Sequence, residues 1–289
     1  MAPQTERRTM PIGVVIPAHN EEKFIGRCLD SLLEQAEKDE FQVVVVANGC
    51  TDRTAEIAKS YGDPVRVLML AEGSKTNALN AGEAELDLDS FPRIYLDGDL
   101  ALSTDAARQI CRTVTDPCTL AASPRFEFDL SGSSWPVRAF FNIWQKLPYL
   151  TNGRIAGAYA LSKRGRTRFD RFPKIISDDG YVRLHFRSDE RKTLSSCAVV
   201  VTAPKTIADL VKIKTRSRLG TLQLREQFPH LIENENTSET ASLQQMLRYP
   251  GLVLDCIVYL AVNVVARYRA VVQWRKGAVG WERDESSRI

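Results

Sequence analysis

The stretch IGVVIPAHNEEKFIGRCLDSLLEQ (residues 12–35) contains the unit from which the fold is built. Its first six residues form a β-branched apolar run, which predicts a buried strand. Apolar side chains then recur at helical spacing, which predicts a helix with one apolar face: Phe24, Ile25, Cys28, Leu29, Leu32 and Leu33. The stretch is therefore predicted to be a strand, a polar loop and a helix.

The same unit returns three times in the first hundred residues. The further apolar runs are FQVVVVA (41–47), PVRVLML (64–70) and FPRIYLD (91–97). Helical patterns follow them at 52–61, from near Ser74 and from about Thr104. Strands this apolar are covered on both faces, and intervening helices favour right-handed crossovers. We therefore predict an α/β fold with a mostly parallel, Rossmann-like sheet and flanking helices.

The second half of the chain is less regular. Residues 135–149 are rich in aromatic side chains, 152–165 contain a predicted strand, and 176–186 are predicted to be a loop that enters a helix. Another strand is expected at 197–204, and the chain is predicted to be helical from Thr206 onward. The apolar segment 251–266 is shorter than the roughly 20 residues that span a bilayer. It is predicted to be a buried helix or a dimer surface, with an interfacial membrane helix as the alternative.

Composition excludes several classes of protein. The 289 residues are 44% hydrophobic and 26% charged, as expected of a globular chain rather than a disordered or fibrous one. The net charge of +3 is too small to indicate a general nucleic-acid binder. The six cysteines form no CxxC pair, which argues against a zinc site or a disulfide framework. The short polar start MAPQTERRTM has no apolar signal region, so we expect a cytoplasmic location.

Polar clusters follow three of the four predicted strands. They are PAHNE (17–21), ANGCTD (47–52) and DGD (97–99). Ligands of open parallel sheets bind outside the carboxyl ends of the strands. One polar loop carries little information, since loops are generally polar, but three at one edge predict a binding site.

Asp97, Gly98 and Asp99 allow two interpretations. Asp-Gly at a strand end is a common turn. The two carboxylates also lie on one side of an extended backbone and are hard oxygen ligands suited to Mg²⁺ or Mn²⁺. The residues alone leave both open.

Two other charged segments are equally ambiguous. Ser177, Asp178 and Asp179 fit an ordinary helix start, or they place a catalytic carboxylate there. Basic residues between 205 and 225 form either a solvated helix face or a phosphate clamp: Lys205, Lys212, Lys214, Arg216, Arg218 and Arg225. The same alternatives hold for Lys75, at the start of the third helix.

Five of these segments, taken in order, resemble the family 2 glycosyltransferases, which have the GT-A fold. They are VVIPAHNEEKFIGRCLDSLLEQ (14–35), VVVVANGCTDRTAEIA (43–58), KTNALNAG (75–82), YLDGDL (95–100) and ISDDGYVRLHF (176–186). Together they cover most of residues 12 to 190.

The resemblance implies roles for individual residues. Asp97 and Asp99 match the DxD motif that holds a divalent cation, Mn²⁺ or Mg²⁺, and Asp179, next to Asp178, matches the catalytic base. The nucleotide-sugar site would comprise Pro17, Ala18, His19, Asn20, Glu21, Asn48, Asp52, Lys75, Asn80, Asp97, Gly98, Arg216 and Arg218. The acceptor side would include Trp144, Tyr149 and Gly157.

The activity that the resemblance implies is inverting transfer of a single sugar from a nucleotide sugar to a hydroxyl acceptor, which would be a glycan, a glycolipid or a small molecule. Ala47-Asn48 replaces the family's usual acidic pair, so a UDP-sugar donor is an expectation that rests on the family alone. The QxxRW motif of processive synthases is absent, which favours single transfers. A nucleotidyltransferase and a catalytically silent sugar-nucleotide-binding module remain as alternatives.

We expect the glycosyltransferase domain to span residues 1–203, with the nucleotide-binding half at about 11–100 and the acceptor-side half at 101–203. Residues 204–289 would form a helical region that contacts the inner face of the cell membrane or a second copy of the chain. No nucleic-acid partner is expected.

Overall fold

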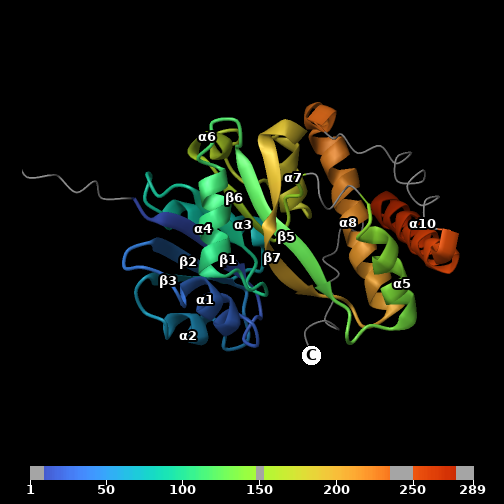
Figure 1. Cartoon of the computed structure of the whole chain (residues 1–289), viewed down its shortest axis with the longest axis horizontal. Coiled ribbons are helices and arrows are strands. Elements are labelled where there is room, and N and C mark those ends of the chain that lie inside the picture. Colours follow the sequence, from blue (N-terminus) through green and yellow to red (C-terminus); the bar gives the residue numbers. More distant parts are fainter. Residues whose placement is uncertain (1–9, 148–152, 235–249, 278–289) are drawn as a thin grey trace, which may run out of the picture.

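A computed structural model describes residues 10–147, 153–234 and 250–277. Its centre is one seven-stranded sheet in the order β3-β2-β1-β4-β6-β5-β7 (Figure 1). The strands are β1 Ile12–Ala18, β2 Phe41–Asn48, β3 Val65–Leu70, β4 Arg93–Leu96, β5 Ala121–Asp129, β6 Ala158–Leu161 and β7 Arg191–Thr202. Strands β1 to β4 are parallel, β6 is antiparallel to both of its neighbours, and β5 and β7 are parallel. The predicted mostly parallel sheet is confirmed.

Helices cover both faces of the sheet. In chain order they are α1 Ile25–Leu33, α2 Thr54–Lys59, α3 Lys75–Glu85, α4 Thr104–Thr113, α5 Trp135–Trp144, α6 Lys163–Arg166, α7 Asp178–Leu184, α8 Ile207–Gln227 and α10 Val253–Arg275. Short 3₁₀ turns lie at Ser188–Glu190, Pro229–Asn234 and Pro250–Leu252. Figure 1 shows α1, α2 and α4 on one side of the sheet, with α3 on the other.

The apolar runs form two cores, one on each face. Alternate strand residues Val14, Ile16, Val43 and Val45 pack with α1 and α4, whereas Val15, Val44 and Val46 pack with α3 and α7. Gly82 allows the close approach of α3, because a Cβ there would lie 2.5 Å from Val15 Cγ1.

One strand inside the sheet, next to its edge, was missed by the sequence analysis. β5 lies between β6 and β7, although its sequence AASPRFEFD contains a proline and three charged residues. The register of β5 against β7 shifts between Pro124 and Arg125, so the strand tolerates a residue that cannot donate to a regular ladder. β7 also begins at Arg191, six residues before the predicted start at Cys197, because it accompanies β5 along its whole length.

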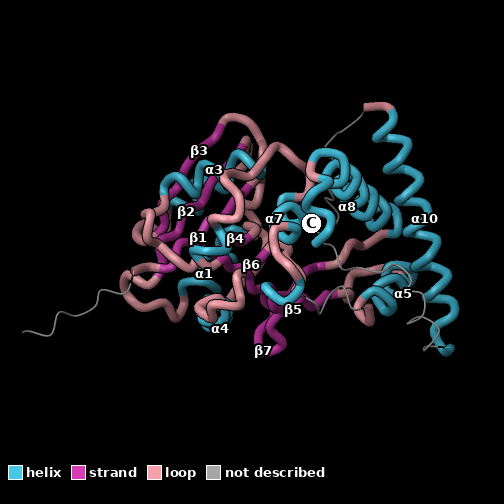
Figure 2. Tube along the Cα trace, turned by 90° about the horizontal axis from the view of Figure 1, so that it is seen from above, coloured by secondary structure: helices cyan, strands magenta, loops and turns pink. Residues whose placement is uncertain are grey.

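Helices α5, α8 and α10 pack together beyond the β5–β7 end of the sheet (Figures 1 and 2). Their shared core contains Val137, Phe140, Leu210 and Val262. One face of α10 is buried at Val262, Ala266 and Ala270, but the opposite face is exposed. Within the residues that the structure describes, no helix is long and apolar enough to cross a membrane.

Candidate active site

Lys75 joins the ends of three elements at the carboxyl edge of the sheet. Its Nζ lies 2.7 Å from Asp97 Oδ1, after β4, and 3.2 Å from Asp178 Oδ2, at the start of α7. Lys75 is the first residue of α3, and the Oγ of Ser74 before it accepts a hydrogen bond from Asn77 N–H. Residues that are far apart in the sequence thus form one partly buried ionic cluster.

The pKa values of Lys75 and Asp97 are both raised. Burial opposes a charge on Lys75, but Asp178 and Asp97 outweigh it and raise the pKa of the ammonium, which stays charged. Burial also raises the pKa of Asp97 to about 6; Lys75 acts against this shift, and Asp99 adds to it. One lysine therefore compensates the carboxylates only in part.

Asp97 belongs both to the Asp-Gly turn and to the ionic cluster. Asp97 N–H donates to Gly157 O at 2.7 Å, and Asp97 O accepts from Leu100 N–H at 3.0 Å, which closes the turn. A Cβ on Gly157 would lie 2.9 Å from Asp97 Oδ2. Gly157 thus leaves space for the Asp97 carboxylate, and its role on the acceptor side stays a prediction.

Gly157→Ala is expected to lower any activity that depends on Asp97 by about 10- to 100-fold, because the added methyl group displaces the Asp97 carboxylate. Gly132→Ala is the matched control, since a Cβ there comes no closer than 4.0 Å to Lys205 Cγ. Equal turnover by the two variants would show that Asp97 does not need this position.

Asp178 and Asp179 differ in exposure. Asp178 is 5% exposed and belongs to the Lys75 cluster. Asp179 is half-buried, and its Oδ1 accepts hydrogen bonds from Ser177 Oγ at 2.9 Å and from Gly180 N–H at 2.7 Å. Helix α8 packs against the turn at Ser177: a Cβ on Gly220 would lie 2.7 Å from Ser177 Cβ.

The loop after β1 is tied to the loop after β2 by side chains that the sequence analysis assigned to nucleotide binding. The Asn48 amide donates to Ala18 O at 2.7 Å and accepts from Ser74 N–H at 2.9 Å. His19 Nδ1 lies 2.6 Å from Asn48 O. Asn48 is 2% exposed, and its side chain joins the end of β1 to the residue before α3.

Neighbouring residues extend this loop framework. Asp52 accepts hydrogen bonds from Thr54 and from Glu22 N–H, which fixes the start of α2. Glu21 is buried, and its N–H donates to Thr54 Oγ1. Gly98 packs beside this loop: a Cβ there would lie 3.3 Å from Ala18 Cβ. The Pro17–Glu21 loop and the DGD turn are therefore in contact, as predicted from their common edge. Asp99 follows in the same turn, and its carbonyl accepts from Arg27 Nη2 at 3.2 Å.

Other predicted site residues have separate contacts. Asn80 exchanges two hydrogen bonds of 2.9 Å with the backbone of Phe172. Arg216 is one turn from Gly220 on α8, so both lie on the face towards α7. Arg218, about 200° around the helix from Arg216, donates to Asn263 of α10 at 3.3 Å. Tyr149 is outside the described residues.

Tyr159 was missed by the sequence analysis. Tyr159 lies in β6, two residues after Gly157, and this spacing places both on the same side of the extended backbone. Its ring stacks on Tyr95 with centroids 5.0 Å apart, and its buried hydroxyl has no hydrogen-bond partner among the described residues. Burial, followed by the charge of Asp178, raises its pKa. The spacing of two residues from Gly157 could have indicated from the sequence that Tyr159 lies near the site.

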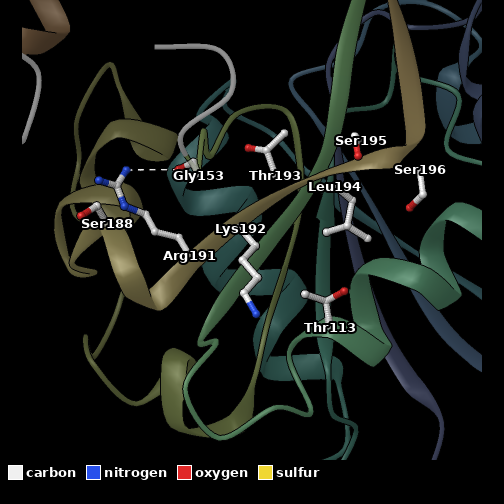
Figure 3. A pocket seen from close by; sticks show the side chains of 9 residues that line it. All are labelled: Thr113, Gly153, Ser188, Arg191, Lys192, Thr193, Leu194, Ser195 and Ser196. Atoms are coloured by element: carbon white, nitrogen blue, oxygen red, sulfur yellow. Dashed lines mark hydrogen bonds between the residues drawn. The ribbon is translucent and has the colours of Figure 1, made fainter. Parts of the chain in front are cut away.

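A cavity of about 720 Å³ lies along β7 (Figure 3). Its lining includes Arg191, whose guanidinium donates to Gly153 O at 3.1 Å, together with Lys192 and Ser196. None of the residues predicted for donor or metal binding lines it, so the cavity does not define the candidate site.

The residues at the DGD turn fit a divalent cation. Asp97 and Asp99 supply hard oxygen atoms, and the Asp97 side chain keeps 33% of its surface exposed. Across residues 10–147, 153–234 and 250–277, no three His, Cys, Asp or Glu side chains are grouped to enclose a metal by themselves. The two carboxylates would therefore hold the ion together with water and ligand oxygen atoms, the usual coordination of Mg²⁺.

The strand order of the sheet and the similarity to solved glycosyltransferases show that the chain has the GT-A fold. The family model "Glycosyl transferase family 2" matches residues 13–172, and the chain belongs to that family. This confirms the family and fold that the five sequence segments predicted.

Several known proteins are similar to this chain. A mannosyltransferase from Pyrobaculum calidifontis, solved with GDP-Man and Mn²⁺, has a TM-score of 0.60 and 18% identity over 94% of this chain and 76% of its own. Staphylococcus aureus TarS 1–349 with UDP-GlcNAc has a TM-score of 0.54 and 16% identity, covering 93% and 92%. Uncharacterized glycosyltransferase EpsJ of Bacillus subtilis is 36% identical over 74 residues, which are 25% of this chain and only 21% of EpsJ.

Proposed function

We propose that this protein is an inverting glycosyltransferase that moves a single hexose from a nucleotide sugar, with UDP the favoured nucleotide, to a hydroxyl acceptor. The observation that carries the proposal is the Lys75–Asp97–Asp178 cluster, with Asp179 beside it, at the carboxyl edge of the sheet. That edge is where open α/β sheets bind their ligands. A silent binding module would have no need for so costly a cluster of partly buried carboxylates.

The donor would lie between the β1 loop and the DGD turn. A divalent cation held by Asp97 and Asp99 would offset the negative charge of the departing diphosphate. Lys75 contributes a second positive charge to the cluster, and Arg216 lies on the α8 face towards α7. Asn48, Asp52 and Asn80 act by holding loops in place, since their amide and carboxylate groups already bind protein backbone.

Asp179 is the proposed base. The acceptor hydroxyl must lose its proton as its oxygen attacks the anomeric carbon. Asp179 is half-buried, whereas Asp178 is engaged with Lys75. The hydrogen bonds from Ser177 and Gly180 hold one oxygen of Asp179 in place. Attack on the face opposite the diphosphate inverts the configuration at this carbon.

A panel of nucleotide sugars tests the proposal. We expect hydrolysis of one UDP-sugar with Mn²⁺ or Mg²⁺, loss of at least about 100-fold in rate after chelation, and recovery when the ion is restored. The measurement is released nucleotide with and without EDTA. Cleavage that persists undiminished after chelation, or no binding of any nucleotide sugar, would contradict the proposal.

We also propose that α10 docks on an anionic membrane surface, which accounts for its exposed face. Seven large apolar side chains there are 42% to 70% exposed: Val253, Leu254, Ile257, Leu260, Val264, Val265 and Tyr268. The second half of the helix and the residue after it carry Arg267, Arg269, Arg275 and Lys276, and the only acid, Asp255, is at the other end. Apolar area beside basic residues favours anionic lipid.

Vesicle flotation tests this surface. The protein is expected to float with phosphatidylglycerol vesicles, to do so less with phosphatidylcholine, and to remain in the soluble fraction after Ile257→Gln with Val264→Gln. A stable dimer that buries α10, without vesicle binding, would replace the membrane by a second copy of the chain.

A further inference from the structure

Both oxygen atoms of the Asp97 carboxylate have close neighbours. Oδ1 lies 2.7 Å from the Lys75 ammonium, the distance of a charge-assisted hydrogen bond. Oδ2 lies against Gly157, where an added Cβ would be 2.9 Å away. A second cation on Asp97 would be repelled by the ammonium on the same carboxylate. A metal ion that binds Asp97 must therefore compete with Lys75.

Lys75 lies between an accessible carboxylate and a buried one. The side chains of Asp97, Lys75 and Asp178 are 33%, 23% and 7% exposed, in that order. The ammonium has three N–H donors, so it can bind Asp97 and also Asp178 Oδ2, which is 3.2 Å away. A cation from solvent reaches Asp97 first, and Asp178 keeps a partner for Lys75 when Asp97 is taken.

The backbone at Lys75 is fixed, whereas its side chain is long and flexible. Ser74 N–H donates to Asn48 Oδ1 at 2.9 Å, and Ser74 Oγ accepts from Asn77 N–H. These bonds hold the start of α3 on either side of Lys75. The four-carbon stem of a lysine lets the ammonium move while the helix stays in place. Exchange of one carboxylate for another partner therefore needs no change in the fold.

A permanent structural ion pair is the alternative interpretation, and the chain contains such a pair for comparison. Glu83 binds Arg93 and Arg166, and all three side chains are at most 13% exposed. Its partners are guanidinium groups, whose rigid forks suit buried pairs. The contact of Lys75 with Asp97 differs in both respects, since its cation is a mobile ammonium and its carboxylate is one-third exposed.

We propose that Lys75 is an exchangeable counter-ion: it holds the Asp97 carboxylate in the free protein, gives this carboxylate up to the divalent cation and remains on Asp178. This deepens the proposed function and rests on it, because it takes Asp97 as a ligand of the cation. Once released from Asp97, the ammonium can turn its free N–H donors towards the diphosphate of the donor. In the metal-free protein it reduces the repulsion between the two carboxylates.

Titration of the full chain with Mn²⁺, without nucleotide, tests the exchange. The electron paramagnetic resonance signal measures the free ion. Lys75→Met keeps the length of the side chain and removes its charge, so no cation has to be displaced. It is expected to lower the Kd for Mn²⁺ by about 10-fold or more. Lys75→Arg keeps the charge and should restore the Kd of the wild type to within about 3-fold.

A matched control and a fallback variant accompany this titration. Lys163 pairs with Asp89 at 2.8 Å, but the two side chains are 64% and 65% exposed. Lys163→Met should therefore leave the Kd for Mn²⁺ unchanged. If Lys75→Met does not fold, Lys75→Gln, which is neutral but keeps two N–H donors for the carboxylates, provides the measurement.

Thermal unfolding provides a second readout that needs no activity. Without metal, Lys75→Met is expected to have a lower Tm than the wild type, because Asp97 and Asp178 lose their shared counter-charge. Mn²⁺ should raise the Tm of Lys75→Met more than that of the wild type, since tighter binding stabilises the folded state more. An unchanged or higher Kd for Mn²⁺ in Lys75→Met would mean that Lys75 does not compete with the ion, and it overturns the exchange.

Hydrolysis of the nucleotide sugar by the wild type, measured with Mn²⁺, separates the two proposals. If the wild type cleaves a nucleotide sugar while Lys75→Met binds Mn²⁺ no more tightly, the exchange is wrong and the transferase proposal remains. If Lys75→Met binds Mn²⁺ more tightly but the wild type cleaves no nucleotide sugar, the transferase proposal fails and the exchange at Asp97 remains.

Discussion

Replacement of Asp179 by asparagine is expected to lower kcat for sugar transfer by about 10²- to 10⁴-fold, the usual contribution of a general base. Asparagine has the same shape, and its side-chain oxygen still accepts from Ser177 and Gly180. The turn at the start of α7 should therefore keep its geometry. Because the donor binds through other groups, its KM should change only a few-fold. Initial rates at several donor concentrations separate the two parameters.

Two further substitutions make this result specific. Asp189→Asn is the matched control, because its carboxylate is 67% exposed and pairs with Arg187 on the surface. Asp178→Asn removes one of the two carboxylate partners of Lys75 and is expected to weaken donor binding as well as kcat. Full transfer activity of purified Asp179→Asn would show that another group takes the proton.

Most of the sheet was predictable from the sequence because its strands are buried on both faces. Continuous apolar runs such as those of β1 and β2 have no other stable place in a protein of this size. β5 was not predicted because its own sequence has no continuous apolar run. It is a strand because β7 pairs with it on both sides of the irregularity at Pro124. Local apolarity does not reveal a strand that tertiary pairing supports.

The candidate site was predictable as a set of residues at one edge, but not as a set of contacts. Strand direction brings Asp97 and the loop after β1 together, and helix starts bring Lys75 and Asp178. The orientation of α8 about its own axis decides which arginine faces α7. Arg216 and Arg218 are only two residues apart, but they lie about 200° apart around the helix. The contact between Trp144 of α5 and Lys214 of α8 required the packing of one helix on the other, which no local pattern contains.

A second ionic network, which is almost fully buried, lies next to the candidate site. Glu83 of α3 lies 3.1 Å from Arg93 Nη1 in β4 and 2.5 Å from Arg166 Nη2 in α6, and it accepts a hydrogen bond from the Tyr95 hydroxyl. All of the charged side chains are almost fully buried. The ring of Tyr95 stacks on Tyr159, next to the Lys75–Asp97–Asp178 cluster. Glu83 thus compensates the charges of two buried guanidinium groups close to the candidate site.

Removal of the Glu83 carboxylate is expected to have the largest effect on stability. Glu83→Ala should lower the free energy of unfolding by about 3–5 kcal/mol, because it leaves Arg93 and Arg166 buried without their counter-charge. That is a large part of the roughly 5–15 kcal/mol that stabilises a typical domain. Urea denaturation of the purified protein measures the change. If the alanine variant does not fold, Glu83→Gln, which keeps the shape and one acceptor oxygen, provides the measurement.

A control two residues away separates burial from charge. Glu85, also in α3, pairs with Arg66 at 2.7 Å, but the two side chains are 39% and 59% exposed. Exposed pairs contribute about 0–1 kcal/mol, so Glu85→Ala should change the free energy of unfolding by no more than that. Similar small losses for Glu83→Ala and Glu85→Ala would show that water or a rearranged side chain compensates the two arginines. The difference expected here arises because Arg93 and Arg166 are held by the backbone carbonyls of Asp87 and Phe169, and cannot turn outward when Glu83 is removed.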